Sequence, residues 1–168
     1  CTPHAAFGMK GVIIAHHPPV LGCTDSLALN YNPNADTDDG SCTYPMTYIP
    51  DDNFEQALID KGLDDILDDS VNTSYINNVQ VLYISYRDIN DLTGIEAFVS
   101  LTTLECQGND FTSLDVSNNT ALRYFYCFDN QLTSLDVSQN TALEHLVCHE
   151  NQLTSLDLSN NTALTELD

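Results

Sequence analysis

Apolar residues in the second half of the chain recur at a fixed interval that is longer than any helix or strand period. Aligned from a leucine, the segments 101–121, 122–142 and 143–163 are three 21-residue copies of one pattern, and "LTELD" at 164–168 begins another. Each copy reads L-x-x-L-x-C-x-x-N-x-L, with phenylalanine in some leucine positions. An earlier, degenerate copy at 79–89 has Leu82, Ile84 and Ile89 in the apolar positions and Arg87 in the asparagine position. Such a period indicates a stack of identical supersecondary units.

This pattern is a leucine-rich repeat signature. It predicts a leucine-rich repeat solenoid over 79–168, built of short parallel β-strands with an irregular convex side, in which each coil buries its apolar face only against its neighbours. The recurring asparagines are expected inside the coil, where their amides satisfy backbone groups. The last copy is truncated, and Leu164 and Leu167 would leave its core open. We therefore expect the natural chain to continue with further repeats.

Alternation along each strand assigns side chains to the core or to the surface. Cys106, Cys127 and Cys148 point inward and are predicted to form a column of buried, reduced thiols. The stretch "LEHLVCHEN" at 143–151 offers ligands for a transition metal, but His145 and His149 point outward and stand roughly 13 Å apart along a strand. One ion cannot bridge that separation, so the stretch is predicted to be repeat core and not a metal centre.

Outward strand positions differ from copy to copy, whereas the core positions barely change. They read Val81/Tyr83/Ser85, Thr103/Glu105/Gln107, Tyr124/Tyr126/Phe128 and His145/Val147/His149. Side by side, these positions make an aromatic strip flanked by histidines, and clustered exposed aromatics favour recognition. The predicted ligand-binding face comprises Tyr83, Glu105, Gln107, Tyr124, Tyr126, Phe128, His145 and His149. The alternatives are that these positions vary by sequence drift on a solvent-exposed face, or that a neighbour outside this sequence covers them.

A helical N-terminal cap is predicted at 51–78, after a linker at 46–50. In "DDNFEQALIDKG", Asp52 is the expected N-cap with Glu55 in the capping-box position, and Gly62 ends the helix. Phe54 and Leu58 share one face of this helix. A short amphipathic helix ahead of a solenoid would cover the apolar edge of the first repeat.

A Cys-bracketed module rich in Asn and Asp is predicted at 22–45, following a leading tail at 1–21 that we expect to be disordered. One interpretation is a calcium site, because Ca²⁺ takes six to eight oxygen ligands and side-chain oxygens alternate here. The candidate ligands are Asn30, Asn32, Asn34, Asp36, Asp38 and Asp39. The alternative is a turn-rich loop closed by a Cys23–Cys42 disulfide.

Charge and composition exclude several classes of function. The chain has 168 residues, with 4 basic and 25 acidic side chains and a formal charge of −21. Such a balance argues against nucleic acid and anionic membranes as partners, because both require a basic face. No apolar run approaches the roughly 20 residues of a membrane span. The five histidines form no catalytic spacing with a nucleophile, and no phosphate-binding loop is present, so we expect no enzymatic activity.

The repeats resemble the 21-residue leucine-rich repeats of secreted and surface proteins from Bacteroidetes-type bacteria. "IPDDNFEQALIDKGLDD" resembles the helical cap of those proteins, and "GCTD…NYNP…DDGSC" is similar to the modules that they carry. The resemblance extends over residues 22–168. It implies export, an extracellular or cell-surface location, and adhesion to a protein or glycan ligand, without catalytic residues. A passive spacer or stalk, and an accessory domain of a larger secreted hydrolase, are the alternative functions.

Overall fold

The computed structural model describes residues 17–168 and divides the chain into two compact units. The first unit ends at Thr43, and the second runs from Tyr44 to Asp168. Each unit is described by itself. Within the described residues, no helix has the length and apolar character that crossing a membrane requires.

The first unit is a loop-rich module closed by the predicted Cys23–Cys42 disulfide. Cys23 is almost fully buried, and a single β-bridge joins Leu21 to Thr37. The carbonyl of Val20 accepts hydrogen bonds from the amides of Asp36 and Thr37. The tail expected at 1–21 is therefore wrong at its C-terminal end, because residues 20–21 belong to the module. The rest of that prediction, residues 1–16, lies outside the described residues.

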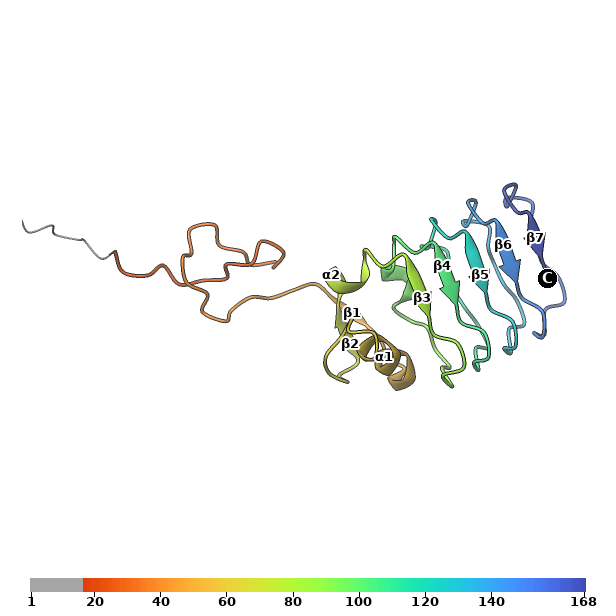
Figure 1. Cartoon of the computed structure of the whole chain (residues 1–168), viewed down its shortest axis with the longest axis horizontal. Coiled ribbons are helices and arrows are strands. Elements are labelled where there is room, and N and C mark those ends of the chain that lie inside the picture. The colour runs from red at the N-terminus through yellow and green to blue at the C-terminus, as the bar shows by residue number, and fades with distance from the viewer. Residues whose placement is uncertain (1–16) are drawn as a thin grey trace, which may run out of the picture. The chain divides into compact units, whose positions relative to one another are not determined.

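The second unit contains a five-stranded parallel sheet, with one strand from each repeat (Figure 1). The strands are β3 (Val81–Tyr83), β4 (Thr103–Glu105), β5 (Tyr124–Tyr126), β6 (His145–Val147) and β7 (Glu166–Leu167). Their order in the sheet is their order in the chain. Leu82 pairs in register with Leu104, which pairs with Phe125, and so on along the stack. The predicted solenoid of short parallel strands is confirmed.

The core of this unit runs the length of the stack, with the inward side chains of successive strands in contact. Leu82, Leu104, Phe125 and Leu146 are fully buried, as are the thiols of Cys106 and Cys127. After each of β3 to β6 the chain turns through a left-handed residue, which is Tyr86, Gly108, Asp129 or Glu150. At Gly108 a side chain would collide with the ring of Tyr86, whose Cδ1 atom lies 2.1 Å from the position of an added Cβ. Glycine is therefore required at this turn.

The recurring asparagines after these turns bind backbone groups of two adjacent coils, as predicted. The side-chain oxygen of Asn109 accepts the amides of Arg87 and Ile89, and its Nδ2 donates to the carbonyls of Ile84 and Cys106. Asn130 and Asn151 make equivalent bonds one and two repeats later. Each asparagine thus links its own coil to the preceding one.

A second asparagine ladder, which the sequence analysis did not predict, lies on the return side of the coils. Asn119, Asn140 and Asn161 are buried at 21-residue intervals. The Nδ2 of Asn119 donates to the carbonyls of Ile95 and Phe98, at 2.9 and 3.1 Å. The side-chain oxygens of this ladder have no hydrogen-bond partner within the described chain. The regular spacing was visible in the sequence and would have indicated the ladder.

Residues 44–79 form a small mixed segment at the β3 end of the stack (Figure 1). It contains β1 (Met46–Tyr48), α1 (Asp52–Ile59), β2 (Ser70–Asn72) and α2 (Thr73–Ile76), and β1 pairs antiparallel with β2. A single 3₁₀ turn (Ile95–Ala97) lies in the first repeat. The prediction of a linker at 46–50 is wrong, because β1 occupies most of it and Ile49 is fully buried.

The predicted helix is present, but its start differs from the prediction. The N-cap is Asp51, whose carboxylate accepts the amides of Asn53 and Phe54. Glu55 does not complete a capping box. Its buried carboxylate instead accepts the amides of Asp68, Asp69 and Ser70 at 2.9–3.1 Å. A carboxylate that binds three backbone donors fixes the loop ahead of β2 more strongly than it would stabilise a helix end.

Candidate ligand-binding face

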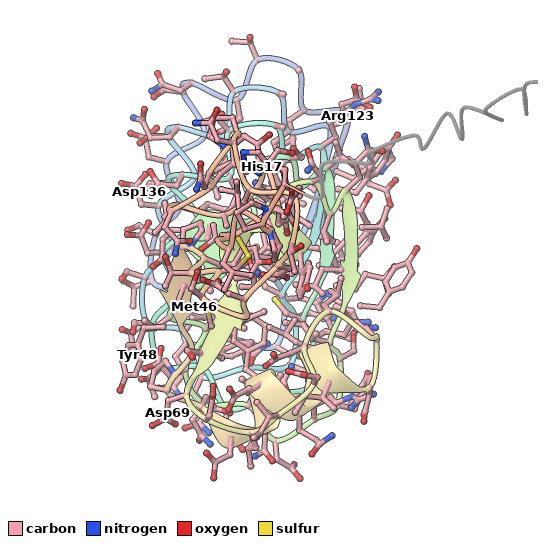
Figure 2. All side chains as sticks on the ribbon, turned by 90° about the vertical axis from the view of Figure 1, so that its left-hand side faces the viewer. His17, Met46, Tyr48, Asp69, Arg123 and Asp136 are labelled. Carbon is pink, nitrogen blue, oxygen red and sulfur yellow. A yellow bond between two sulfur atoms is a disulfide. The ribbon has the colours of Figure 1, made fainter. Side chains whose placement is uncertain are left out.

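The outward side chains of β3–β7 and of the residues that follow them form one continuous surface, here called the strand face. Parallel register aligns them in rows across the stack. One row is Val81, Thr103, Tyr124, His145 and Glu166; the next begins Tyr83, Glu105, Tyr126 and Val147. In the view along the stack (Figure 2), Arg123 lies beside the strands and Asp136 on the opposite side of the coil. The alignment of side chains in these rows is thus determined by strand pairing and not by loop conformation.

Aromatic and imidazole rings contact one another across the boundary between β5 and β6. The rings of Tyr124 and His145 are 5.0 Å apart and tilted. Those of Phe128 and His149 stack at 4.7 Å with an angle of 10° between their planes. The structure therefore brings together the central and histidine members of the predicted face. Stacked rings lose little conformational freedom on binding, which suits a recognition surface.

Carboxylates that were not included in the predicted site accompany each of these rings. Glu166 Oε2 lies 2.9 Å from His145 Nδ1, and Asp168 Oδ2 lies 3.6 Å from His149 Nδ1. Glu166 lies on β7, the strand that follows the histidines, and Asp168 comes directly after it. Parallel register would have placed Glu166 beside His145, because the two are one repeat apart.

An ion pair just before the first residues of β5 and β6 contacts Tyr124 at the edge of the strand face. Arg123 donates to Glu144 Oε1 from Nε and Nη2, at 2.9 and 2.6 Å. The guanidinium carbon is 5.6 Å from the centre of the Tyr124 ring, and the Tyr124 hydroxyl lies 3.3 Å from Glu144 Oε2. Arg123 and Glu144 are again one repeat apart, so their pairing follows from the 21-residue period.

Tyr126 lies at the centre of the face with acidic neighbours. Burial raises the pKa of its hydroxyl, and the negative charges of Glu105 and Glu166 raise it further. Tyr83, in the same row, is half exposed at 53%. Within residues 17–168, the Glu105 carboxylate takes part in no ion pair or hydrogen bond. The centre of the face therefore combines two phenol rings with an unpaired negative charge.

Inward residues of the same strands contribute no reactive group to this surface. Cys106, Cys127 and Cys148 are free and buried, in the column predicted from the sequence. Burial raises the pKa of each thiol, so all three are neutral at physiological pH. In the stretch 143–151, Cys148 points into the core, whereas His145 and His149 point away from it.

Five of the six residues proposed as calcium ligands use a side-chain oxygen to bind a backbone amide of the first unit. Asn30 accepts the amide of Thr43 and donates to the carbonyl of Ser41. Asn32 accepts the amide of Asn34. One oxygen of each aspartate does the same: Asp36 accepts from Val20, Asp38 from Gly40 and Asp39 from Ser41. The bonds of Asn32, Asp38 and Asp39 are those of Asx turns, whereas Asn30 and Asp36 bind amides 13 and 16 residues away. Calcium binding by this module stays a prediction.

One cluster of carboxylates in the described part of the chain has the spacing of metal ligands. Oxygen atoms of Asp52, Glu55 and Asp69 lie within 4.8 Å of one another. The Glu55 carboxylate already binds three backbone amides, and the two aspartates are exposed. The cluster is explained by its role in fixing the loop at 68–70.

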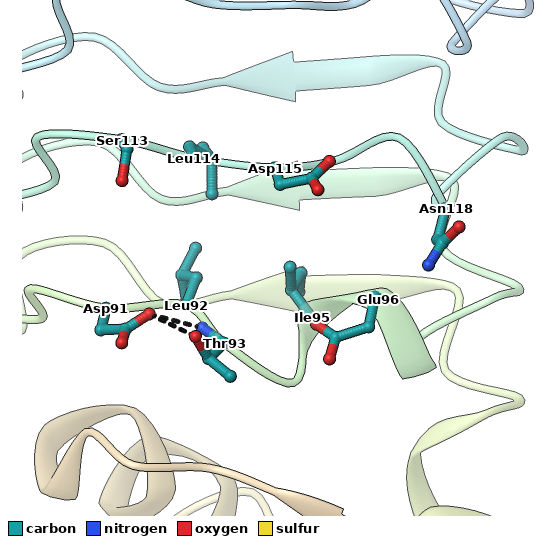
Figure 3. Close-up of a pocket in the computed structure, with 9 residues that line it drawn as sticks. All are labelled: Asp91, Leu92, Thr93, Ile95, Glu96, Ser113, Leu114, Asp115 and Asn118. Carbon is teal, nitrogen blue, oxygen red and sulfur yellow. Dashed lines mark hydrogen bonds between the residues drawn. The ribbon is translucent and has the colours of Figure 1, made fainter.

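A groove of about 490 Å³ lies on the return side, between the first two repeats (Figure 3). Its acidic members have local partners: Asp91 accepts from the amide and hydroxyl of Thr93, and Glu96 accepts the amide of Gly94. The amide of Ser117 binds Asp115 and holds the pKa of that carboxyl below its usual value. These acids stabilise turns, and none of the predicted site residues lies in the groove.

Solved structures of other proteins share the architecture of the second unit. The chain is similar to the functional domain of InlJ from Listeria monocytogenes, which includes a cysteine ladder, with 36% identity over 74% of this chain and a TM-score of 0.68. The chain has the leucine-rich repeat fold. Its own column of Cys106, Cys127 and Cys148 occupies one position of three successive coils.

Two further Listeria monocytogenes proteins show the same fold at lower identity. An internalin, inlF, is 21% identical over 71% of this chain with a TM-score of 0.61. The internalin C2 is 20% identical over 71% of this chain with a TM-score of 0.66. The chain spans 28%, 43% and 54% of the lengths of InlJ, inlF and internalin C2. No family model and no curated protein matches the chain.

Proposed function

We propose that this chain is a non-catalytic, extracellular binding module that recognises a protein ligand through its strand face. The observation that carries the proposal is the ring cluster of Tyr124, Phe128, His145 and His149 on the strand face. A few residues supply most of the binding energy at protein interfaces, and tyrosine is among the types enriched in that role. The similarity to internalin structures supports a binding role for the repeats.

The proposal includes an exported, cell-surface location. A disulfide such as Cys23–Cys42 persists in oxidising compartments, which supports export. A formal charge of −21 keeps such a protein soluble in extracellular salt.

We further propose that α1 acts as the N-terminal cap of the solenoid. Phe54, Ala57 and Leu58 are fully buried in the same core as the repeats. The Phe54 ring lies 6.3 Å from that of Phe98, in the first repeat. This contact covers apolar side chains that have no preceding coil to bury them.

Binding to arrays of extracellular proteins and of glycans tests the proposed function. Three forms of the full chain are compared: the wild type, the face variant Tyr126→Ser/Phe128→Ser, and the return-side variant Asp136→Asn/Asp157→Asn. We expect the wild type and the return-side variant to bind the same proteins, and the face variant to lose at least about tenfold in affinity because it lacks two aromatic contacts.

Circular dichroism of all three forms shows that each is folded. Binding that survives in the face variant and disappears in the return-side variant would contradict recognition through the strand face. Binding to glycans alone would replace the protein ligand with a carbohydrate on the same surface. Finding no ligand for any form would favour a spacer.

A further inference from the structure

Glu105 is flanked on both sides by tyrosines in one row of the strand face. Tyr83 pairs with Glu105 across β3 and β4, and Glu105 pairs with Tyr126 across β4 and β5. Neighbouring strands lie about 4.8 Å apart, so the carboxylate stands between two phenol rings. Tyr83 is half exposed, whereas Glu105 and Tyr126 are more deeply buried. The row is therefore an accessible surface with one fixed negative charge.

Within residues 17–168, no cationic side chain pairs with this carboxylate. Arg87 pairs with Asp60, and Arg123 pairs with Glu144. The carboxylates of Glu105 and Glu166 both raise the pKa of Tyr126, so two negative charges act on this row. This carboxylate is therefore available to pair with an external cation through charged hydrogen bonds.

A second acceptor in the same strand segment also lacks a donor. Gln107, two residues after Glu105 and on the same face, has a side-chain oxygen that is buried without a hydrogen-bond partner in the described chain. Buried acceptors are normally satisfied. This part of the face thus holds two acceptors, on Glu105 and Gln107, that receive no donor from the described chain.

We propose that the row Tyr83–Glu105–Tyr126 receives a lysine or arginine side chain of the protein ligand. The carboxylate of Glu105 accepts hydrogen bonds from the cationic group, and the faces of the two phenol rings attract its charge. The overall charge of −21 steers basic segments toward the molecule, and this row supplies the specific contact. The inference rests on the proposed function and specifies the chemistry of the ligand.

Short peptides test this inference without knowledge of the natural ligand. The full chain, with isotope-labelled tyrosine rings, is titrated with three blocked pentapeptides, Gly-Gly-X-Gly-Gly, in which X is arginine, lysine or citrulline. Citrulline has nearly the shape of arginine but no charge. We expect the arginine and lysine peptides to shift the ring resonances of Tyr83 and Tyr126, and the citrulline peptide to leave them unchanged.

Two variants with the same change of charge locate the site. Glu105→Gln is expected to weaken binding of the arginine peptide by about tenfold, which corresponds to the loss of one charged hydrogen bond. Asp157→Asn removes one charge from the return side, where Asp157 binds only the turn at Ser159. This control should bind the peptide as the wild type does.

Equal shifts with citrulline, equal affinity in Glu105→Gln, or no shift at millimolar peptide would each overturn the inference. The proposed function has a separate test, because a protein ligand that is lost in Tyr126→Ser/Phe128→Ser but retained in Glu105→Gln would bind the strand face without a basic contact at this row.

Discussion

At the scale of single residues, buried asparagines and cysteines determine how the coils stack. The side chain of Asn109 makes hydrogen bonds with four backbone groups and that of Asn119 with two, and both asparagines are in the core. Their amides replace the helix or sheet bonds that the turning backbone lacks. The cysteines fill one inward position of three successive coils, and Ile84 occupies that position in the first repeat.

Asn119→Asp should destabilise the protein severely. The change keeps the shape of the side chain but directs a carboxylate oxygen at the carbonyls of Ile95 and Phe98. Loss of both donated bonds and burial of charge are expected to lower the free energy of unfolding by about 3 kcal/mol or more. Urea unfolding measures this difference.

Asn118→Asp is the matched control, since Asn118 is exposed one position earlier. Its effect should be within about 0.5 kcal/mol of zero. Equal destabilisation by both variants would mean that added charge, and not the buried ladder, causes the loss.

The buried thiols should make stability fall at alkaline pH. Burial raises the pKa of Cys106 and Cys127, so both stay neutral in the folded state. Below about pH 8.5 the thiols are neutral in both states. Above it they ionise only when unfolded, so each lowers the free energy of unfolding by about 1.4 kcal/mol per pH unit.

Urea unfolding under reducing conditions at pH 8 and pH 10 measures this dependence. The decrease should be smaller in Cys106→Ala by about 2 kcal/mol, because one titrating thiol is absent. Thiol reagents should not modify Cys106 or Cys127 until the protein unfolds. Modification of either in the folded protein would contradict the inward register.

At the scale of elements, the two N-terminal segments depend on different stabilising features. The module before Tyr44 is held by a disulfide and by side chains that bind backbone amides, with few buried apolar residues. The segment 44–79 shares its core with the repeats. Small units without a core commonly rely on such covalent links.

Truncation of Phe54 should destabilise the repeats as well as the helix that carries it. Phe54→Ala removes a fully buried ring next to Phe98 and should cost about 3–5 kcal/mol. Amides in β3 should then exchange hydrogen faster. Gln56→Ala, on the exposed face of α1, should cost less than about 1 kcal/mol. If β3 exchange is unchanged in Phe54→Ala, α1 does not cap the solenoid.

Calcium should slow proteolysis of the 22–42 module, if the free oxygens of Asp36, Asp38 and Asp39 bind it. Oxidised protein is digested with Ca²⁺, with Mg²⁺ and with EDTA. Protection by Ca²⁺ alone, lost in Asp36→Asn/Asp38→Asn, is the expected result. Equal cleavage in all three conditions would leave a loop stabilised by its disulfide and Asx turns.

At the scale of the whole molecule, the 21-residue repeat determines which side chains form the strand face. Because one period of 21 residues sets both core and surface, the sequence predicted which side chains would share a row. Leu82, Leu104 and Cys106 lie where alternation placed them, and Tyr124 lies beside His145.

Other features depended on contacts that no period encodes. Glu55 was predicted to cap its own helix, but it binds a loop more than ten residues later in the chain. The linker expected at 46–50 forms β1 because β2, more than 20 residues away, supplies its partner. Both are non-local pairings, and local sequence patterns do not specify them.

Site-specific photocrosslinking tests most directly whether ligands bind the strand face. A photoreactive phenylalanine analogue replaces Val147 on the strand face, or Asp136 on the return side, in otherwise native full-length chain. With a protein ligand found on the arrays, we predict that position 147 crosslinks to it and that position 136 does not. Crosslinking from position 136, with none from position 147, would contradict the account.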